Sequence, residues 1–374
     1  MREYLLVAIV ATAITFVTAP AMWWAAERWG ALAPVRDRDV HSVPIPYLGG
    51  VAMLFGFAAA MLVANRLPYL GTLFGNTDMI RVLAAAVIIT VIGAIDDFRD
   101  LDPLTKIAGS IIAALVMSGF GGVQLLFLPI LGTQTILPQP MLLILTILIV
   151  IVTTQAVNFA DGLDGLAAGT VAIAALAFFI WTYTTSHNDE GQVFSIATFI
   201  SAVMIGCCLG FLPYNFHPAK LFMGDAGALL LGLLLAASTI SFTGNFNLTQ
   251  SSVDQSAKIA ILLPIAVPVV ILALPILDVI LAFIRRGGHF WQPDKKHLHH
   301  RMLQMGHSHR RAVLLLYLWS ASVSGGVLSF NYLSPYTATA IFVGLLAMAL
   351  ALTLGLPKLG CKLLLVIVIT SRRP

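Results

Sequence analysis

Three short segments carry acidic or amide side chains, and two of them also carry glycines, a pattern typical of metal and phosphate chemistry. They are Asp96–Asp97, the run Asn158-Phe-Ala-Asp161-Gly-Leu-Asp164-Gly, and Asp225 within Phe222-Met-Gly224-Asp-Ala-Gly. Carboxylate and carbonyl oxygens are the ligands that Mg²⁺ prefers, and glycine lets the backbone approach a ligand closely. These segments predict a magnesium site. For the 158–165 run an ordinary Asp-Gly turn is the alternative.

The first pair of acids lies where a helix should end. Asp96 and Asp97 follow an apolar stretch directly, and a helix C-terminus favours cations over anions. A nearby cation or a diphosphate pocket would explain the pair, and a solvated helix end is the alternative. Asp102-Pro103 instead predicts an N-cap and first helical position, with Lys106 one turn into that helix.

Asp225 lies where the next polar segment should become a helix. An acid is favourable at a helix start, so a plain N-terminal carboxylate is the alternative to a ligand role. The flanking glycines leave the carboxylate open, and Phe222 offers a stacking face. Asn215 and Lys220 add an amide and a cation to the same loop.

The segment 285–311 is rich in histidine, lysine and arginine. Three interpretations fit it: a basic patch for anionic lipid, a histidine metal site, or a cationic partner for phosphates opposite the carboxylates. Its cationic or ionisable residues include Arg285, Arg286, Lys295, Lys296, His297, His299, His300, Arg301, His307, His309, Arg310 and Arg311.

Composition predicts an all-α, polytopic integral membrane protein. The 374 residues are 59% hydrophobic and 10% charged, with a mean hydropathy of +0.93, whereas soluble domains are about 25% charged. Apolar stretches of roughly 20 residues are long enough to span a bilayer, and they lack the strict alternation of a barrel. We expect eleven spans, or ten, in one domain covering 1–374: 4–24, 47–65, 80–95, 105–121, 141–157, 166–184, 193–212, 226–242, 258–284, 312–330 and 336–369.

Counting these spans puts every polar segment on one side of the membrane. Most of the 21 Lys and Arg residues lie on that side, which predicts that it is cytoplasmic, with the N-terminus outside and the C-terminus inside. The net charge of +4 is therefore a topology signal, and no nucleic-acid partner is expected. An uncleaved first helix is favoured over a signal peptide.

Two further features lie inside the spans. The three cysteines offer neither a disulfide framework nor a metal motif. Asp278 lies within the span 258–284, and a mid-membrane acid is normally paired or functional. We expect a structural pair with Arg285, about two helical turns on.

In this order, the motifs resemble those of the polyprenyl-phosphate N-acetylhexosamine-1-phosphate transferases, the family of MraY and the WecA/TagO-type enzymes. The resemblance extends from Arg36 to about Arg311. It rests on Asp96-Asp97, Asn158-Phe-Ala-Asp161-Gly-Leu-Asp164-Gly, Phe222-Met-Gly-Asp225 and His297-Leu-His299-His300-Arg301. Each motif alone is weak, but the ordered set on one membrane face is specific.

The resemblance implies Mg²⁺-dependent transfer of a sugar-1-phosphate from a UDP-sugar to a polyprenyl phosphate, undecaprenyl or decaprenyl, with release of UMP. Mn²⁺ is the alternative ion. It implies a multi-pass enzyme of the inner (plasma) membrane that acts in cell-envelope polysaccharide synthesis, with a homodimer as an open alternative. The implied metal ligands are Asp225 and Asn158; the catalytic groups are Asp96, Asp97, His299 and His300; the substrate contacts are Lys106, Asn158, Asp161, Asp164, Asn215, Phe222, Gly224, His297 and Arg301.

Two departures favour the WecA/TagO-type branch, which uses UDP-N-acetylglucosamine. The triple-His element of MraY is here His-Leu-His-His, and its Lys-x-Gly-Thr-Pro-Thr segment is His41-Ser-Val-Pro-Ile-Pro46. The alternative is a phospho-N-acetylmuramoyl-pentapeptide transferase of the MraY type. An ion transporter is a weaker rival, because transporters place their sites near the bilayer midplane, often in repeated halves. We expect direct attack by the lipid phosphate in place of a covalent aspartyl intermediate.

Overall fold

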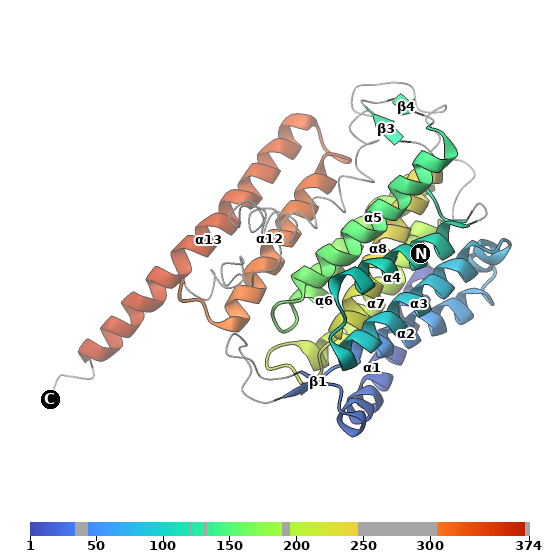
Figure 1. The fold of residues 1–374 in the computed structure, drawn as a ribbon. Helices are drawn as coiled ribbons and strands as arrows, with labels where there is room; N and C mark the ends of the chain where they lie inside the picture. The colour runs from blue at the N-terminus through green and yellow to red at the C-terminus, as the bar shows by residue number, and fades with distance from the viewer. Residues whose placement is uncertain are drawn as a thin grey trace.

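The computed structural model describes residues 1–33, 44–119, 122–126, 128–130, 133–135, 137–188, 195–245 and 305–370. Long helices dominate it (Figure 1). They are α1 (Arg2–Trp29), α2 (Gly49–Ala64), α3 (Asp78–Arg99), α4 (Pro103–Ser118), α5 (Gln139–Ala160), α6 (Leu166–Asn188), α7 (Ile196–Asn215), α8 (Gly224–Asn245), α12 (His309–Ser329) and α13 (Pro335–Thr370), with the 3-10 turn η1 (Leu70–Phe74).

Strands contribute only two small antiparallel pairs within the described residues. β1 (Leu32–Ala33) pairs with β2 (Ile45–Pro46), and β3 (Leu128–Ile130) pairs with β4 (Thr133–Thr135). The first pair lies at the end of the bundle where α1 finishes, and the second lies at the opposite end (Figure 1). The all-α fold class is therefore confirmed.

The predicted spans correspond closely to these helices. Eight of the described helices are long and apolar enough to cross a membrane, whereas α2 and α4 are apolar but shorter. Each has 16 residues, about 24 Å of helix against a hydrocarbon core of about 30 Å. Helix α13 runs as one helix from Pro335 to Thr370. The chain is thus a multi-pass membrane protein, and the predicted span 258–284, with Asp278, lies outside the described residues.

Helix α8 is the central element of the bundle. It packs against α2, α3, α5 and α7. The most apolar stretch of α8 is completely buried, whereas only 17% of the corresponding stretch of α13 is buried. A helix that is apolar on all sides needs such surroundings. The start of α8, where Asp225 lies, is consequently fixed by several neighbours at once.

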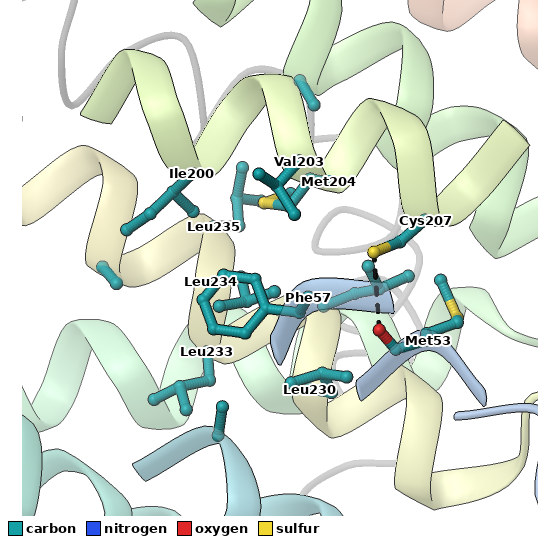
Figure 2. Close-up of a cluster of buried hydrophobic side chains, with 14 of the residues drawn as sticks. Met53, Phe57, Ile200, Val203, Met204, Cys207, Leu230, Leu233, Leu234 and Leu235 are labelled. Carbon is teal, nitrogen blue, oxygen red and sulfur yellow. Dashed lines mark hydrogen bonds between the residues drawn. The ribbon is translucent and has the colours of Figure 1, made fainter. Parts of the chain in front are cut away.

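The core around α8 is made of interlocking apolar side chains. Figure 2 shows Phe57 of α2 placed among leucines of α8, including Leu230 and Leu234, with Ile200 of α7 nearby. The Cys207 thiol of α7 donates a hydrogen bond to the Met53 carbonyl oxygen at 3.4 Å (Figure 2). Cys207 and Cys208 are both free and buried.

The polar segments converge at one end of the bundle. The C-terminal ends of α3, α5 and α7 and the N-terminal ends of α4, α6, α8 and α12 meet there, on the same end as β1 (Figure 1). Alternating up-and-down helices place these ends together, so the prediction that distant motifs share one face is confirmed for the described part of the chain.

Glycines let the backbone of α8 touch its neighbours at this end. A Cβ on Gly50 of α2 would lie 2.0 Å from the Gly227 nitrogen, and one on Gly93 of α3 would lie 2.5 Å from the Ala226 Cα. Both obstacles are backbone atoms, which cannot move aside as a flexible side chain can. The first turn of α8 is therefore held in direct backbone contact with α2 and α3.

We predict that Gly50→Ala destabilises the folded protein, because the added methyl group overlaps the backbone of α8 and overpacking costs about 1–3 kcal/mol. The thermal unfolding midpoint in detergent should fall by about 1–4 °C, since the unfolding entropy grows with chain length. Gly344→Ala in α13 is the matched control, since a Cβ there has open space. An unchanged midpoint for Gly50→Ala would show that the two helices are not in backbone contact.

Candidate active site

An ammonium group joins two acids that lie far apart in the sequence. Lys106 Nζ is 2.7 Å from Asp96 Oδ2 and 2.6 Å from Asp225 Oδ2. Asp96 is almost fully buried, whereas Lys106 and Asp225 are partly exposed. Asp96 also accepts a hydrogen bond from the Leu101 N–H at 2.7 Å. The end of α3 and the starts of α4 and α8 thus form one charged cluster.

Helix α4 presents Lys106 to this cluster because its start is well defined. Asp102 is the N-cap and Pro103 the first helical residue, as predicted, and the Asp102 carboxylate accepts from the Thr105 N–H at 3.2 Å. The hydrogen bond from the Thr105 hydroxyl lowers the pKa of Asp102. Asp102 therefore has the structural role that the sequence predicts.

The second acid of the pair makes different contacts. Asp97 Oδ1 accepts a hydrogen bond from the Asp225 N–H at 2.8 Å, and Asp97 Oδ2 accepts one from the Ala226 N–H at 3.5 Å. Gly224 makes room for this carboxylate, since a Cβ at Gly224 would lie 2.3 Å from Asp97 Oδ2. Asp97 thus binds the backbone at the start of α8.

Asn158, at the last turn of α5, reaches the same cluster. Its amide nitrogen donates to Asp225 Oδ2 at 3.1 Å, which leaves its carbonyl oxygen as a further hard ligand. Asp161 follows directly after α5. Desolvation raises the pKa of Asp161 to about 7, and the charges of Asp225 and Asp164 act in the same direction. Near neutral pH this carboxyl group can therefore act as a hydrogen-bond donor or acceptor.

The donor set at this cluster fits Mg²⁺. One carboxylate oxygen each from Asp96, Asp97 and Asp225 lie within 4.8 Å of one another, and hard oxygens are what that ion prefers. Lys106 already places a positive charge between two of these acids. The position between the end of α3 and the start of α8 therefore favours a cation.

Asn215 and Asp164 hold the neighbouring loops together. Asn215, buried at the end of α7, accepts from the Gly165 N–H at 3.0 Å and donates to the Leu221 carbonyl at 3.1 Å. Asp164 Oδ2 accepts from the Ala219 N–H at 3.2 Å. The α5–α6 and α7–α8 loops are thereby fixed to each other beside the charged cluster.

Two histidines join Asp164 to the start of α12. His217 Nδ1 is 2.7 Å from Asp164 Oδ2, and His309 Nε2 is 4.0 Å from the same oxygen. Their rings are stacked, with centroids 4.1 Å apart and planes 17° apart. The nitrogen lone pairs lie in the ring planes, so stacked rings do not direct them at one point. As arranged, this group is a polar anchor, and metal binding would require one ring to rotate.

Further contacts fasten α12 at this place. Arg310 Nε donates to the His217 carbonyl at 3.0 Å, and the Tyr317 hydroxyl donates to the Gly165 carbonyl. Leu163 and Val313 belong to an apolar cluster beneath these bonds. The residues just after the His-rich motif are therefore tied to the loops around the charged cluster.

Phe222 lies in the loop just before α8. Its N–H donates to the Pro46 carbonyl at 2.9 Å, and its carbonyl accepts from the Gly49 N–H at 3.0 Å. The Phe222 ring lies 6.1 Å from the Tyr47 ring, centroid to centroid. The segment before α2 and the loop before α8 are thus paired through their backbones.

The structure brings together most of the residues selected from the sequence. Asp96, Asp97, Lys106, Asn158 and Asp225 form the charged cluster, and Asp161, Asp164, Asn215, Phe222 and Gly224 line the adjoining loops. His297, His299, His300 and Arg301 lie outside the described residues. The anchor of α12, whose members are His217, His309, Arg310 and Tyr317, was not among the site residues predicted from the sequence. A sequence signal that pointed to this anchor was His217, which lies between Asn215 and Asp225.

Comparison with known proteins places this cluster among transferases. The family model of glycosyl transferase family 4 matches residues 79–243, which include every member of the charged cluster. The decaprenyl-phosphate N-acetylglucosaminephosphotransferase of Mycobacterium tuberculosis is 42% identical over 361 residues, which cover 95% of this chain and 89% of the relative.

Two other relatives match less of the chain. The probable undecaprenyl-phosphate N-acetylglucosaminyl 1-phosphate transferase of Bacillus subtilis is 33% identical over 83% of this chain and 80% of its own length. The phospho-N-acetylmuramoyl-pentapeptide-transferase of Desulforudis audaxviator is 34% identical over 64% of this chain and 76% of its own length. The Mycobacterium tuberculosis relative matches 95% of the chain at 42% identity. The protein therefore belongs to glycosyl transferase family 4, together with the polyprenyl-phosphate N-acetylglucosaminephosphotransferases.

Proposed function

We propose that the protein transfers N-acetylglucosamine-1-phosphate from UDP-N-acetylglucosamine to a polyprenyl phosphate and releases UMP. The observation that carries the proposal is the convergence of Asp96, Lys106, Asn158 and Asp225 at one end of the helix bundle. The relatives that match the most of the chain are named for this transfer. The muramoyl-pentapeptide relative covers only 64% of the chain.

The proposed reaction is a substitution at phosphorus. An oxygen of the lipid phosphate attacks the β-phosphorus of the donor, and a new P–O bond forms. The bond from that phosphorus to the oxygen bridging the two donor phosphates breaks, and UMP leaves with the bridging oxygen. The sugar keeps its bond to phosphate, so the anomeric carbon does not react. Such chemistry requires positioning and charge stabilisation.

We propose that Asp225 and Asn158 hold Mg²⁺, with Mn²⁺ as the alternative. The bound ion would neutralise charge on the donor diphosphate. Lys106 lies 2.6 Å from Asp225, so its ammonium is close enough to share that task by binding a phosphate oxygen. Asp96 is proposed to position the acceptor phosphate and to accept its proton when it arrives protonated.

The adjoining loops are proposed to bind the nucleoside and the phosphates. Asp161, Asp164, Asn215 and Gly224 would shape the nucleoside pocket, with Phe222 near uracil. The start of α12 is anchored beside the site, and the His-rich motif precedes it by a few residues in the sequence. His297, His299, His300 and Arg301 are proposed to contact donor phosphates or sugar, with the two adjacent histidines assisting catalysis.

The site end of the bundle is proposed to face the cytoplasm. The N-terminus would then lie outside and the C-terminus inside. The excess of Lys and Arg in the polar segments of the sequence that are predicted for this side supports the orientation. The whole chain is proposed to act as one domain of the inner membrane, and a homodimer remains compatible with this arrangement.

A donor panel tests the proposed function. We expect purified protein with polyprenyl phosphate and Mg²⁺ to use UDP-N-acetylglucosamine and to release UMP together with a lipid-linked sugar diphosphate. Preference for UDP-N-acetylmuramoyl-pentapeptide would assign the protein to the other branch of the resemblance. Release of UDP would contradict substitution at phosphorus. Mass spectrometry of the lipid product distinguishes these results.

Asp225→Asn should lower turnover at least about a hundredfold, because loss of one charge contact in a transition state costs about 2.7 kcal/mol or more. Asp78→Asn is the control: Asp78 lies in the first turn of the same α3 that ends at the site, and turnover should change less than about twofold. An Asp225→Asn enzyme that keeps more than about a tenth of the wild-type rate at saturating Mg²⁺ would refute the metal assignment.

Asp96→Asn should reduce kcat by about 10²–10⁴-fold while changing the KM for the donor little. The reason is that Asp96 is proposed to act on the acceptor phosphate. Steady-state kinetics with donor and acceptor varied separately give both constants. A raised donor KM with unchanged kcat would place Asp96 outside the chemistry. Isolation of a covalent phospho-aspartate would exclude direct attack by the lipid phosphate.

A further inference from the structure

We infer that the two acids of the Asp96–Asp97 pair have different tasks, and that Asp97 is a positioning residue for Asp225. This inference rests on the proposed function, and it replaces the expectation that both acids act on the substrate. In brief, Asp97 of α3 caps the start of α8 and so fixes the backbone that carries Asp225.

The first observation is the missing cap of α8. The first N–H groups of any α-helix lack partners within the helix, and a side-chain oxygen at the N-cap usually satisfies one of them. The residue before α8 is Met223, whose side chain cannot do this. Asp97 supplies the oxygens instead, at 2.8 Å from the Asp225 nitrogen and 3.5 Å from the Ala226 nitrogen.

The second observation is that the chain leaves space for this cap. Gly224 has φ +66°, and a Cβ on it would lie 2.3–2.6 Å from three atoms of the Asp97 carboxylate. One turn earlier on α3, Gly93 lies against Ala226. Gly93 and Asp97 are four residues apart, so they lie on one face of α3. That face receives the first turn of α8.

The third observation is the contrast with Asp96. Its carboxylate binds Lys106 Nζ at 2.7 Å and the Leu101 N–H at 2.7 Å, and in the described part of the chain no hydrogen bond joins it to the backbone of α8. Lys106 links Asp96 to the side chain of Asp225. Adjacent residues on a helix point about 100° apart, so Asp96 can face Lys106 while Asp97 faces the backbone at the start of α8.

Substitution by asparagine separates the two possible tasks. Asparagine keeps an oxygen that accepts from the Asp225 N–H, but it cannot serve as a base or nucleophile. We therefore expect Asp97→Asn to retain at least about tenfold more turnover than Asp97→Ala. Asp96→Asn and Asp96→Ala are the matched pair on the neighbouring acid, and these two variants should be similarly impaired.

A second measurement does not depend on activity. Hydrogen exchange of the peptide covering the first turn of α8 should be faster than wild type in Asp97→Ala, because an uncapped N–H opens more readily. Exchange in Asp97→Asn should stay close to wild type. Gly224→Ala should resemble Asp97→Ala, since its methyl group displaces the carboxylate. The concentration of Mg²⁺ for half-maximal activity should rise in both of these variants.

The inference is overturned if Asp97→Asn is as inactive as Asp97→Ala while exchange at the start of α8 is wild-type in both. Should Asp97→Ala fail to fold, Asp97→Asn alone decides: turnover lost by more than about a hundredfold with normal exchange contradicts a positioning role. Failure of the proposed function has a different signature, because the wild-type protein would then release no UMP while the exchange results still stand.

Discussion

The start of α8 is the constraint on which the site depends. Its first turn lies in backbone contact with α2 at Gly50 and with α3 at Gly93, and its N–H groups are bound by Asp97. The rest of α8 is enclosed by other helices. Packing of this density leaves the helix little freedom to shift. The carboxylate of Asp225 is consequently held in one place, although the elements around it come from distant parts of the sequence.

Electrostatics at this place explains why a lysine accompanies the acids. Carboxylates close together at a partly buried helix junction repel each other strongly, because the local dielectric is lower than that of water. Lys106 compensates two of them directly. An arriving divalent ion would compete with this ammonium for Asp225, and the displaced ammonium would be free to meet the diphosphate. The cluster is therefore suited to exchange one cation for another as substrate binds.

Much of this arrangement could be predicted from the sequence, because hydrophobic length and charge placement determine where helices end. The gathering of Asp96, Asn158 and Asp225 at one end follows from counting the apolar spans along the chain. The capping of α8 by Asp97 could not be predicted, since it joins two helices at a spacing that no local pattern encodes. The same is true of the stacked His217 and His309, which only the tertiary fold brings together.

Asn158 at the end of α5 and Asp225 at the start of α8 are proposed to form a single divalent-cation site beside the end of α3. Electron paramagnetic resonance of Mn²⁺ added to the purified protein in detergent tests it most directly. The account predicts one tightly bound Mn²⁺ per chain, lost in Asp225→Asn, with coupling to donor phosphorus after UDP-N-acetylglucosamine is added. Equal Mn²⁺ binding by wild type and Asp225→Asn, with no phosphorus coupling, would contradict it.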